Sequence, residues 1–270
     1  MYVRPPAVAG RFYPSNPAEL STMIDSFVDR THVPLLVVGI IVPHAGYIYS
    51  GHVAGAIYTR VAVPSRTIIL CPNHTGFGVP LSIMRRGAWQ TPLGNVPIDG
   101  EMADALMAAN ADLEEDSEAH RQEHAIEVQL PFIQRGQLGN GTSFVPITVG
   151  VSGWEALERL GKSIAETIQR VDRTTLIIAS SDMNHYESDA ITRVKDARAI
   201  EPLLKLDAKG LHEVVRREKI SMCGVGPATA MLVASRILGA TQADLVKYAT
   251  SAEVSKEFNR VVGYAGVIVS

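Results

Sequence analysis

The sequence predicts an α/β fold in which helices cover both faces of a central sheet that is mostly parallel or mixed. Apolar, β-branched runs recur along the chain, and helical patterns lie between most of them. The runs at 35–42 and 175–179 are continuously apolar, as expected of strands that are buried on both sides. We therefore expect a three-layer α/β/α architecture.

The expected elements alternate along the chain. Apolar runs predict strands at 35–42, 66–70, 81–84, 143–149, 175–179, 244–249 and 262–269. Apolar residues at helical spacing predict helices at 18–28, 55–61, 100–109, 120–134, 153–169, 189–206, 208–217 and 227–238. These patterns do not predict the order of the strands in the sheet.

Capping residues support two of the predicted helices. Ser152 or Gly153 stands just before the helical stripe that begins at Leu157. Pro227 lies just inside the start of the last helix and Gly239 just after its end, which is the usual placement of proline and glycine.

The bulk composition is that of an ordinary globular protein. Of 270 residues, 46% are hydrophobic and 20% are charged, and the net charge is −3. This balance gives no charge-driven attraction to nucleic acid or an anionic membrane, and the longest apolar run is far shorter than the roughly 20 residues of a membrane span. No repeat or linker divides the chain, so we expect one domain over residues 1–270. The N-terminus lacks the apolar core of a signal peptide, which predicts a cytoplasmic protein.

Polar clusters follow three of the predicted strands directly. His44 follows the first strand, His74 the second, and Asp182 and His185 the strand at 175–179. In open α/β sheets, ligands bind beyond the carboxyl ends of the strands. Neighbouring strands would therefore bring these side chains together. Taken alone, His44 and His74 are equally well explained as turn residues bonded to a backbone carbonyl, and Asp182 and His185 as residues that cap the following segment.

The two cysteines are too few for a disulfide framework. Cys223 lies in a glycine-flanked turn before the last predicted helix, where the positive end of a helix dipole lowers the pKa of a thiol and favours a metal-binding thiolate. A buried apolar filler is the alternative for each cysteine. The spacing from Cys71 to His74 resembles half of a zinc motif, but no Cys-x-x-Cys partner accompanies it.

The predicted helix at 120–134 carries several ionisable residues. Glu123 and Glu127 are four residues apart, which places them on one face, and a solvated helix face explains them. His124 has apolar neighbours that indicate partial burial, so it is a candidate proton donor or acceptor. For His52 and His120, surface exposure or helix packing is the simpler interpretation.

Six motifs, in order, resemble those of the Memo family. They are PAVAGRFYP at 6–14, PHAGYIYSG at 43–51, CPNHTG at 71–76, EHAIEVQLPF at 123–132, SSDMNH at 180–185 and MCG at 222–224. Together they span nearly the whole chain. The bacterial and archaeal branch of this family is the AmmeMemoRadiSam system protein B group, so the resemblance also implies an AMMECR-type protein and a radical-SAM protein as partners.

The resemblance implies a fold similar to the LigB-like class III extradiol dioxygenases, whose Fe(II) is held by two histidines and a glutamate. Matched motif by motif, His44 and His74 correspond to the histidine ligands, and Cys223 stands in the place of the carboxylate. The two ligand types define a metal site with two nitrogen donors and one sulfur donor.

The resemblance also implies residues that act around the metal. His185 takes the place of the catalytic base, Asp182 lies with it, and His124 lines the same pocket. Such residues would move or hold protons on a small-molecule substrate.

A ligand set of two histidines and one anion leaves coordination positions open for O₂ and a substrate. The first expectation is therefore a dioxygenase-like oxidoreductase that uses Fe(II) on an unknown small molecule. Thiolate in place of carboxylate softens the site and makes Cu(I) or Zn an alternative. Two other functions stay open: a protein that binds copper or iron without an organic substrate, and a binding module whose vestigial pocket accepts a peptide or partner protein.

Overall fold

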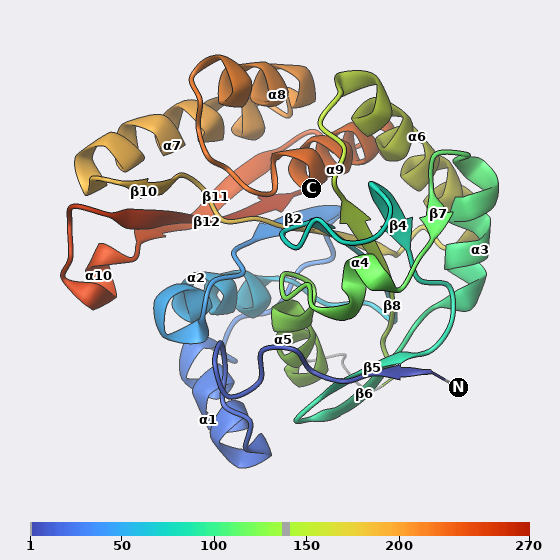
Figure 1. Cartoon of the computed structure of the whole chain (residues 1–270), viewed down its shortest axis with the longest axis horizontal. Coiled ribbons are helices and arrows are strands. Elements are labelled where there is room, and N and C mark those ends of the chain that lie inside the picture. Colours follow the sequence, from blue (N-terminus) through green and yellow to red (C-terminus); the bar gives the residue numbers. More distant parts are fainter. Residues whose placement is uncertain (1, 137–140) are drawn as a thin grey trace.

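The computed structural model describes residues 2–136 and 141–270 and has the predicted three-layer α/β/α architecture (Figure 1). Within these residues, a mixed sheet of nine strands forms the middle layer. A second sheet of three strands lies at one side, near the N-terminus (Figure 1).

The elements have the following bounds. The large sheet contains β2 (Gly39–Val42), β3 (Arg66–Pro72), β4 (Leu81–Ile83), β7 (Glu114–Glu115), β8 (Ser143–Val149), β9 (Leu176–Ser180), β10 (His185–Glu187), β11 (Ala243–Thr250) and β12 (Val261–Val269). The small sheet contains β1 (Val3–Arg4), β5 (Ala88–Thr91) and β6 (Gly94–Pro97). The helices are α1 (Pro17–Phe27), α2 (Tyr47–Arg60), α3 (Gly100–Ala109), α4 (Glu118–Arg121), α5 (Leu130–Arg135), α6 (Trp154–Val171), α7 (Asp189–Leu204), α8 (Ala208–Arg217), α9 (Val225–Ile237) and α10 (Ala252–Ser255), with a 3₁₀ turn at Glu127–Gln129.

The centre of the large sheet is parallel. The spatial order is β10-β12-β2-β9-β3-β8-β4-β7, and β11 also pairs with β12. The strands β2, β9, β3 and β8 are parallel neighbours, whereas β12 runs antiparallel to β2 and β4 runs antiparallel to β8. Because neighbouring parallel strands end at the same edge, the residues that follow β2, β3 and β9 lie close together.

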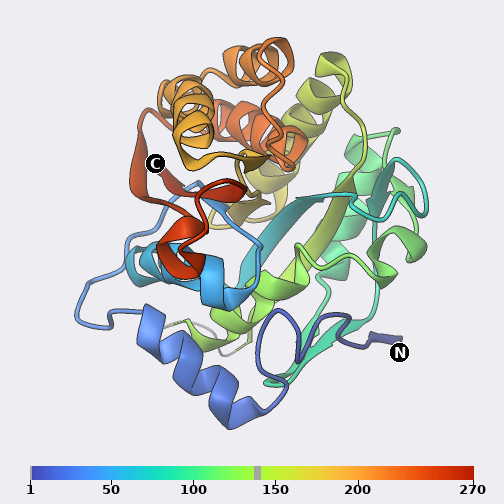
Figure 2. The same ribbon diagram turned by 60° about the vertical axis from the view of Figure 1, so that its left-hand side comes forward.

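Helices cover both faces of this sheet (Figures 1 and 2). The apolar core on one face joins the sheet to α3, α6, α7, α8 and α9. The core on the other face joins it to α1, α2 and α5. Figure 2 shows the orange helices α7 and α8 at the top and the dark-blue helix α1 at the bottom, with the sheet between them. The central strands are therefore buried on both sides, as their continuous apolar character predicts.

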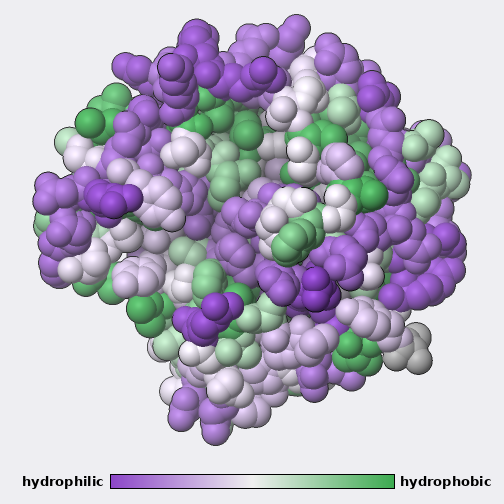
Figure 3. Space-filling view, viewed as in Figure 1, coloured by the Kyte–Doolittle hydropathy of each residue, from purple (hydrophilic) through white to green (hydrophobic). Residues whose placement is uncertain are grey.

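The surface on the side viewed in Figure 1 is largely hydrophilic, and its hydrophobic residues form separate small groups (Figure 3). No helix in the described part of the chain is both long enough and apolar enough to cross a bilayer.

The prediction of one continuous helix at 120–134 is wrong. In the structure, α4 ends at Arg121, a loop follows, and a short 3₁₀ turn leads into α5. Pro131 lies in the first turn of α5, where the lack of an N–H group costs nothing, whereas in a helix interior it would remove a hydrogen bond and clash with the preceding turn. The interpretation of Glu123 and Glu127 as a solvated face is also wrong, because both side chains are fully buried.

Two further boundaries differ from prediction. The helix expected at 55–61 begins earlier, at Tyr47. Within it, Gly51 and Gly55 let the backbone approach Phe27 of α1 so closely that a Cβ atom at either glycine would lie 2.4 Å from that residue. The strand expected from residue 35 begins at Gly39, because the preceding segment lies at the surface with Leu35 63% exposed.

Candidate metal centre

His44, His74 and Cys223 lie together at the edge of the sheet where the parallel strands end. His44 follows β2, His74 follows β3, and Cys223 precedes α9. One ligand atom from each residue lies within 4.8 Å of the ligand atoms of the other two. Sγ of Cys223 is 3.2 Å from Nε2 of His44. The structure thus brings together the two histidines and the cysteine expected as metal ligands.

Ser180, at the end of β9, determines which nitrogen of His44 is free. The Ser180 hydroxyl donates its proton to the carbonyl of Ala125 at 2.7 Å and accepts from Nε2 of Gln129 at 3.0 Å. Nδ1 of His44 lies 3.0 Å from the same oxygen and must therefore be the donor. This arrangement leaves the lone pair on Nε2 of His44, the atom beside Cys223.

Glu123 plays the corresponding part for His74. Its Oε1 lies 2.9 Å from Nδ1 of His74, and its Oε2 accepts from the backbone N–H of His74 at 2.7 Å. A carboxylate bonded to Nδ1 of a histidine is the usual second partner of a metal ligand, because it fixes the ring orientation and leaves Nε2 to bind the metal.

The protonation of the two histidines follows from their surroundings. Burial, strengthened by the neighbouring His74, lowers the pKa of His44 to about 3, so this ring is neutral. Burial acts in the same direction on His74, but the hydrogen bond and charge of Glu123 outweigh it and raise the pKa of His74 above its ordinary value. Burial would raise the pKa of Glu123, but bonding to His74 holds it at about 2, so the carboxylate is ionised.

The expectation that a helix dipole lowers the pKa of the Cys223 thiol is wrong for the metal-free site. Burial, followed by the charge of Asp182, raises the pKa of Cys223 well above its usual value. Cys223 stands before Gly224, the residue that caps α9, so it is outside the first turn of the helix. A metal ion must therefore displace the thiol proton when it binds, as metals do at other cysteine sites.

The donor set fits a soft or borderline metal ion. Two neutral imidazole nitrogens and one thiolate sulfur suit Fe(II), Cu(I) or Zn(II). Both histidines have their Nδ1 atoms engaged, by Ser180 and Glu123, which leaves Nε2 of each ring for a metal. A second group of nearby donors, His74, Glu123 and His124, shares one residue with the first. We interpret Glu123 as an orienting residue because three N–H groups already bond its oxygens.

The three candidate ligands line a cavity of about 550 Å³, and Asp182 and His185 line it too. Oδ1 of Asp182 accepts from the backbone N–H of His44 at 2.8 Å, so it anchors that ligand. Nδ1 of His185 lies 2.8 Å from the carbonyl oxygen of Ser221, which can only accept. His185 therefore carries its proton on Nδ1, and its Nε2 is free to act as a base. Burial raises the pKa of Asp182.

His124 also lines this cavity. Its ring lies 4.8 Å from the ring of His74 and 5.4 Å from that of His44, centroid to centroid. Phe12 covers it at 4.7 Å. Burial, followed by the charge of His44, lowers the pKa of His124 to about 4. The ring is thus neutral near pH 7 and partly buried, as its apolar neighbours predicted.

Sequence reasoning missed Glu123, Ser180, Gln129 and Phe12 as parts of the site. Each lies inside one of the six motifs, and Glu123 directly precedes His124, but a helical pattern suggested a solvated glutamate.

Two other residues prove to be structural. Cys71 is buried near Thr148. His120 is fully buried between Ser82 and Thr148, which agrees with the packing interpretation and not with surface exposure.

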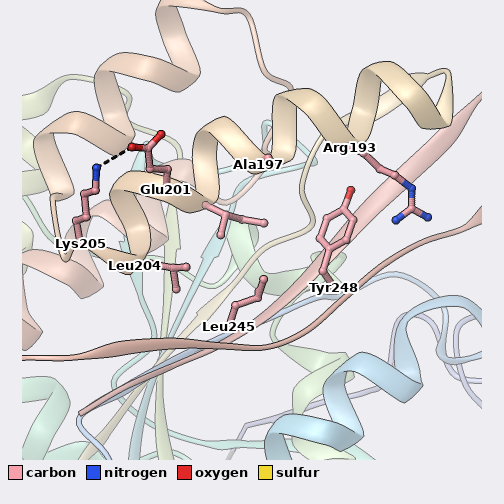
Figure 4. A pocket seen from close by; sticks show the side chains of 8 residues that line it. Arg193, Ala197, Glu201, Leu204, Lys205, Leu245 and Tyr248 are labelled. Atoms are coloured by element: carbon pink, nitrogen blue, oxygen red, sulfur yellow. Dashed lines mark hydrogen bonds and ion pairs between the residues drawn. The ribbon is translucent and has the colours of Figure 1, made fainter.

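A cavity of similar size lies between α7 and β11 but has a different character (Figure 4). Its volume is about 520 Å³, and its walls are largely apolar, with Leu204, Leu245 and the ring of Tyr248 facing the space. Its charged residues form ion pairs: Lys205 pairs with Glu201 at 2.7 Å, and Arg193 pairs with Asp189 at 2.7 Å. It offers no cluster of metal ligands among the described residues, so we place the candidate centre at His44, His74 and Cys223.

Known proteins resemble this chain over nearly its whole length. It is 41% identical over 278 residues to a MEMO1 family protein of Methanopyrus kandleri, covering 98% of each chain. It is 43% identical over 281 residues to a MEMO1 family protein of Ignicoccus hospitalis, covering 99% of this chain and 98% of the relative. An uncharacterized Escherichia coli K12 protein of known structure shares the fold, with a TM-score of 0.59 and 12% identity over 86% of this chain and 99% of that one.

The sequence profile of the family described as Memo-like protein matches residues 4–268. This match contains all six motifs and confirms the resemblance that they indicated. The chain belongs to the Memo-like protein family.

Proposed function

We propose that this protein is a metal-dependent redox protein that acts as a dioxygenase-like oxidoreductase on a small molecule. The observation that carries the proposal is the pairing of each histidine ligand with its own orienting group. Ser180 bonds Nδ1 of His44 and Glu123 bonds Nδ1 of His74, which leaves Nε2 of each ring for a metal, and Nε2 of His44 lies beside Cys223. We propose Fe(II) as the metal, with Cu(I) and Zn(II) as alternatives.

When held by His44, His74 and Cys223, Fe(II) or Cu(I) would supply Lewis acidity and one-electron redox chemistry, whereas Zn(II) would supply Lewis acidity alone. The surrounding residues bind and orient the substrate and move its protons. His185, with its free Nε2, takes a proton from a substrate hydroxyl and later returns it. Asp182 holds the backbone of His44 in place. Phe12 and His124 pack against each other and both line the cavity.

Anaerobic loading with Fe(II), followed by O₂ and catechol-type substrates, tests this function. We expect one iron per chain and O₂ consumption that depends on the organic substrate. His44→Ala removes a ligand and should abolish both. The matched control is His52→Ala, which removes a half-buried histidine of α2 that does not line the cavity. Turnover that persists in His44→Ala would overturn the proposal.

A second candidate is a protein that binds copper or iron without an organic substrate, and the thiol ligand favours it. Thiolate binds Cu(I) well and is itself oxidisable. This function predicts tight Cu(I) binding that is lost in Cys223→Ser, together with O₂ consumption that is the same with and without organic substrates. Electron paramagnetic resonance of wild type and Cys223→Ser, recorded after oxidation to Cu(II) or Fe(III), shows which redox-active metal is retained. The dependence of O₂ consumption on an organic substrate separates the two candidates.

A further inference from the structure

A cavity of about 440 Å³ adjoins the metal-site cavity at Cys223, and we call it the second cavity. Its walls come from the ends of β3 and β8, the start of α6, the last turns of α8 and the start of α9. These three helices pack together on one side of the sheet, at the top of Figure 1. The cavity is separate from the apolar space between α7 and β11 and plays no part in orienting His44 or His74.

The polar groups of this second cavity are suited to an anion. Nη1 of Arg216 donates to the carbonyl oxygen of Ser152 at 3.2 Å, and Nε2 of His212 donates to the same oxygen at 2.8 Å. The remaining N–H groups of the guanidinium are left for a ligand. None of the described residues that line the cavity is Asp or Glu.

Arg216 and its neighbour Arg217 differ in their ion pairing. Arg217 pairs with Glu218 at 3.0 Å and does not line the cavity. For Arg216, the described part of the chain provides no carboxylate within ion-pair distance. Arg216 is exposed and also lines a neighbouring pocket that contains Glu155 and Glu213, but neither glutamate forms an ion pair with it, so the guanidinium stays available to an oxyanion.

Cys223 connects this cavity to the candidate metal centre. It lines both spaces, so the cysteine side chain forms part of the wall between them. We propose that the second cavity is a binding subsite for the carboxylate of a small organic acid, held by Arg216 and placed directly behind the thiol of Cys223. The link to metal chemistry rests on the proposed function, whereas binding of the acid does not.

The remaining lining residues favour an organic acid over a free inorganic anion. Val149, Leu157 and Val225 supply apolar walls, while Asn73 and Ser152 supply polar groups. Small-molecule sites combine apolar walls with a few placed polar groups in this way, at volumes of about 300–1,000 Å³. The planar fork of arginine matches a carboxylate through two parallel hydrogen bonds. A compact acid such as benzoate provides both a carboxylate and an apolar body.

Calorimetric titration of the full chain with benzoate, benzamide and inorganic phosphate tests the subsite. We expect benzoate to bind, and benzamide and phosphate to bind at least about tenfold more weakly, because only benzoate offers both features. Arg216→Gln should weaken benzoate binding by about tenfold or more. Arg217→Gln removes the same charge one residue away and should leave the binding unchanged. Equal binding of benzoate to wild type and Arg216→Gln, or no binding to wild type, would overturn the proposal.

A spectroscopic titration locates the bound acid. In protein loaded with Co(II), the thiolate-to-cobalt absorption band reports on Cys223. Benzoate should shift this band in wild type and in Arg217→Gln but not in Arg216→Gln. An unshifted band in wild type that binds benzoate would place the acid away from Cys223 and contradict the subsite. Complete absence of the band would instead count against the proposed metal centre, and calorimetry would still decide whether Arg216 binds the acid.

Discussion

Glu123 and His74 are joined by two hydrogen bonds, one from the backbone N–H of His74 to Oε2 at 2.7 Å and one between its Nδ1 and Oε1 at 2.9 Å. The carboxylate therefore fixes both the backbone and the ring of a candidate ligand. The backbone of Glu123 is itself anchored, because Arg4 donates to its main-chain carbonyl oxygen at 2.7 Å. The N-terminal segment thus takes part in positioning a residue that lies far from it in the sequence.

Replacing Glu123 by glutamine should weaken metal binding without unfolding the protein. Glutamine keeps the size of the side chain but removes the charge that orients His74, and loss of such a partner typically lowers metal affinity by about 10- to 100-fold. Competition against a chromophoric chelator measures the change. Glu118→Gln, at an exposed ion pair with Arg121, is the matched control. Equal metal affinity in wild type and Glu123→Gln would contradict the orienting role.

The role of Glu123 shows where the sequence was and was not sufficient. The strand-end positions of His44 and His74 were predictable, because buried apolar runs mark parallel strands and these strands end at one edge. The burial of Glu123 was not, because four-residue spacing suggested a solvated helix face, while Pro131 and the bond from Ala125 to Glu123 break that helix. Long-range partners such as Arg4 are invisible to local patterns.

The order of the strands was likewise beyond the sequence patterns. β9 lies between β2 and β3, although it comes after both in the chain. This placement brings Ser180 to His44, 136 residues earlier in the sequence. Hydrophobic periodicity shows which segments are strands but not which strands pair in the sheet. The pairing determines the geometry of the ligands.

The two cysteines should respond differently to substitution. Cys223→Ser removes the proposed sulfur ligand, so the thiolate absorption of Co(II)-loaded protein should vanish and the affinity for Cu(I) should fall by at least about tenfold, since soft metals prefer sulfur. Cys71→Ser removes a buried thiol near Thr148 that is not part of the ligand group. It should retain the absorption band. A band that survives in Cys223→Ser would identify a different ligand.

Loss of the Glu127 carboxylate should destabilise the fold strongly. Its oxygens accept from Arg4 at 2.6 Å, from the backbone of Ala7 and Val8, and from Tyr13 at 2.7 Å. Arg4 and Glu127 are both buried, and removing one member of a buried pair costs about 3–5 kcal/mol because the other charge is left without a partner.

Denaturant unfolding of Glu127→Ala measures this cost in the free energy of unfolding. Glu118→Ala breaks the exposed pair with Arg121 and should cost less than about 1 kcal/mol. If the two variants were equally stable, the buried network would not be what holds the N-terminal segment against the site.

Asp196 should make the protein less stable as the pH rises from about 4 to 6. The carboxyl group is fully buried, and burial raises its pKa to about 6, although bonds from Tyr248 at 2.7 Å and from the backbone N–H of Asn184 at 2.8 Å oppose this shift. In the unfolded chain the pKa is about 3.9. Between these values the folded protein binds more protons than the unfolded chain, so the free energy of unfolding falls as the pH rises, by about 2–3 kcal/mol in total.

Asp196→Asn should abolish this pH dependence. The amide oxygen can still accept from Asn184, and the amide N–H can donate to the Tyr248 hydroxyl, so the contacts survive without a titrating group. We expect the stability of wild type relative to Asp196→Asn to decrease between pH 4 and 6 and to stay constant above pH 7, as measured by denaturant unfolding at each pH. Asp112→Asn, at an exposed pair with Arg159, should change the free energy of unfolding by less than about 1 kcal/mol. A constant difference between wild type and Asp196→Asn from pH 4 to 7 would show that the buried carboxyl does not titrate in this range.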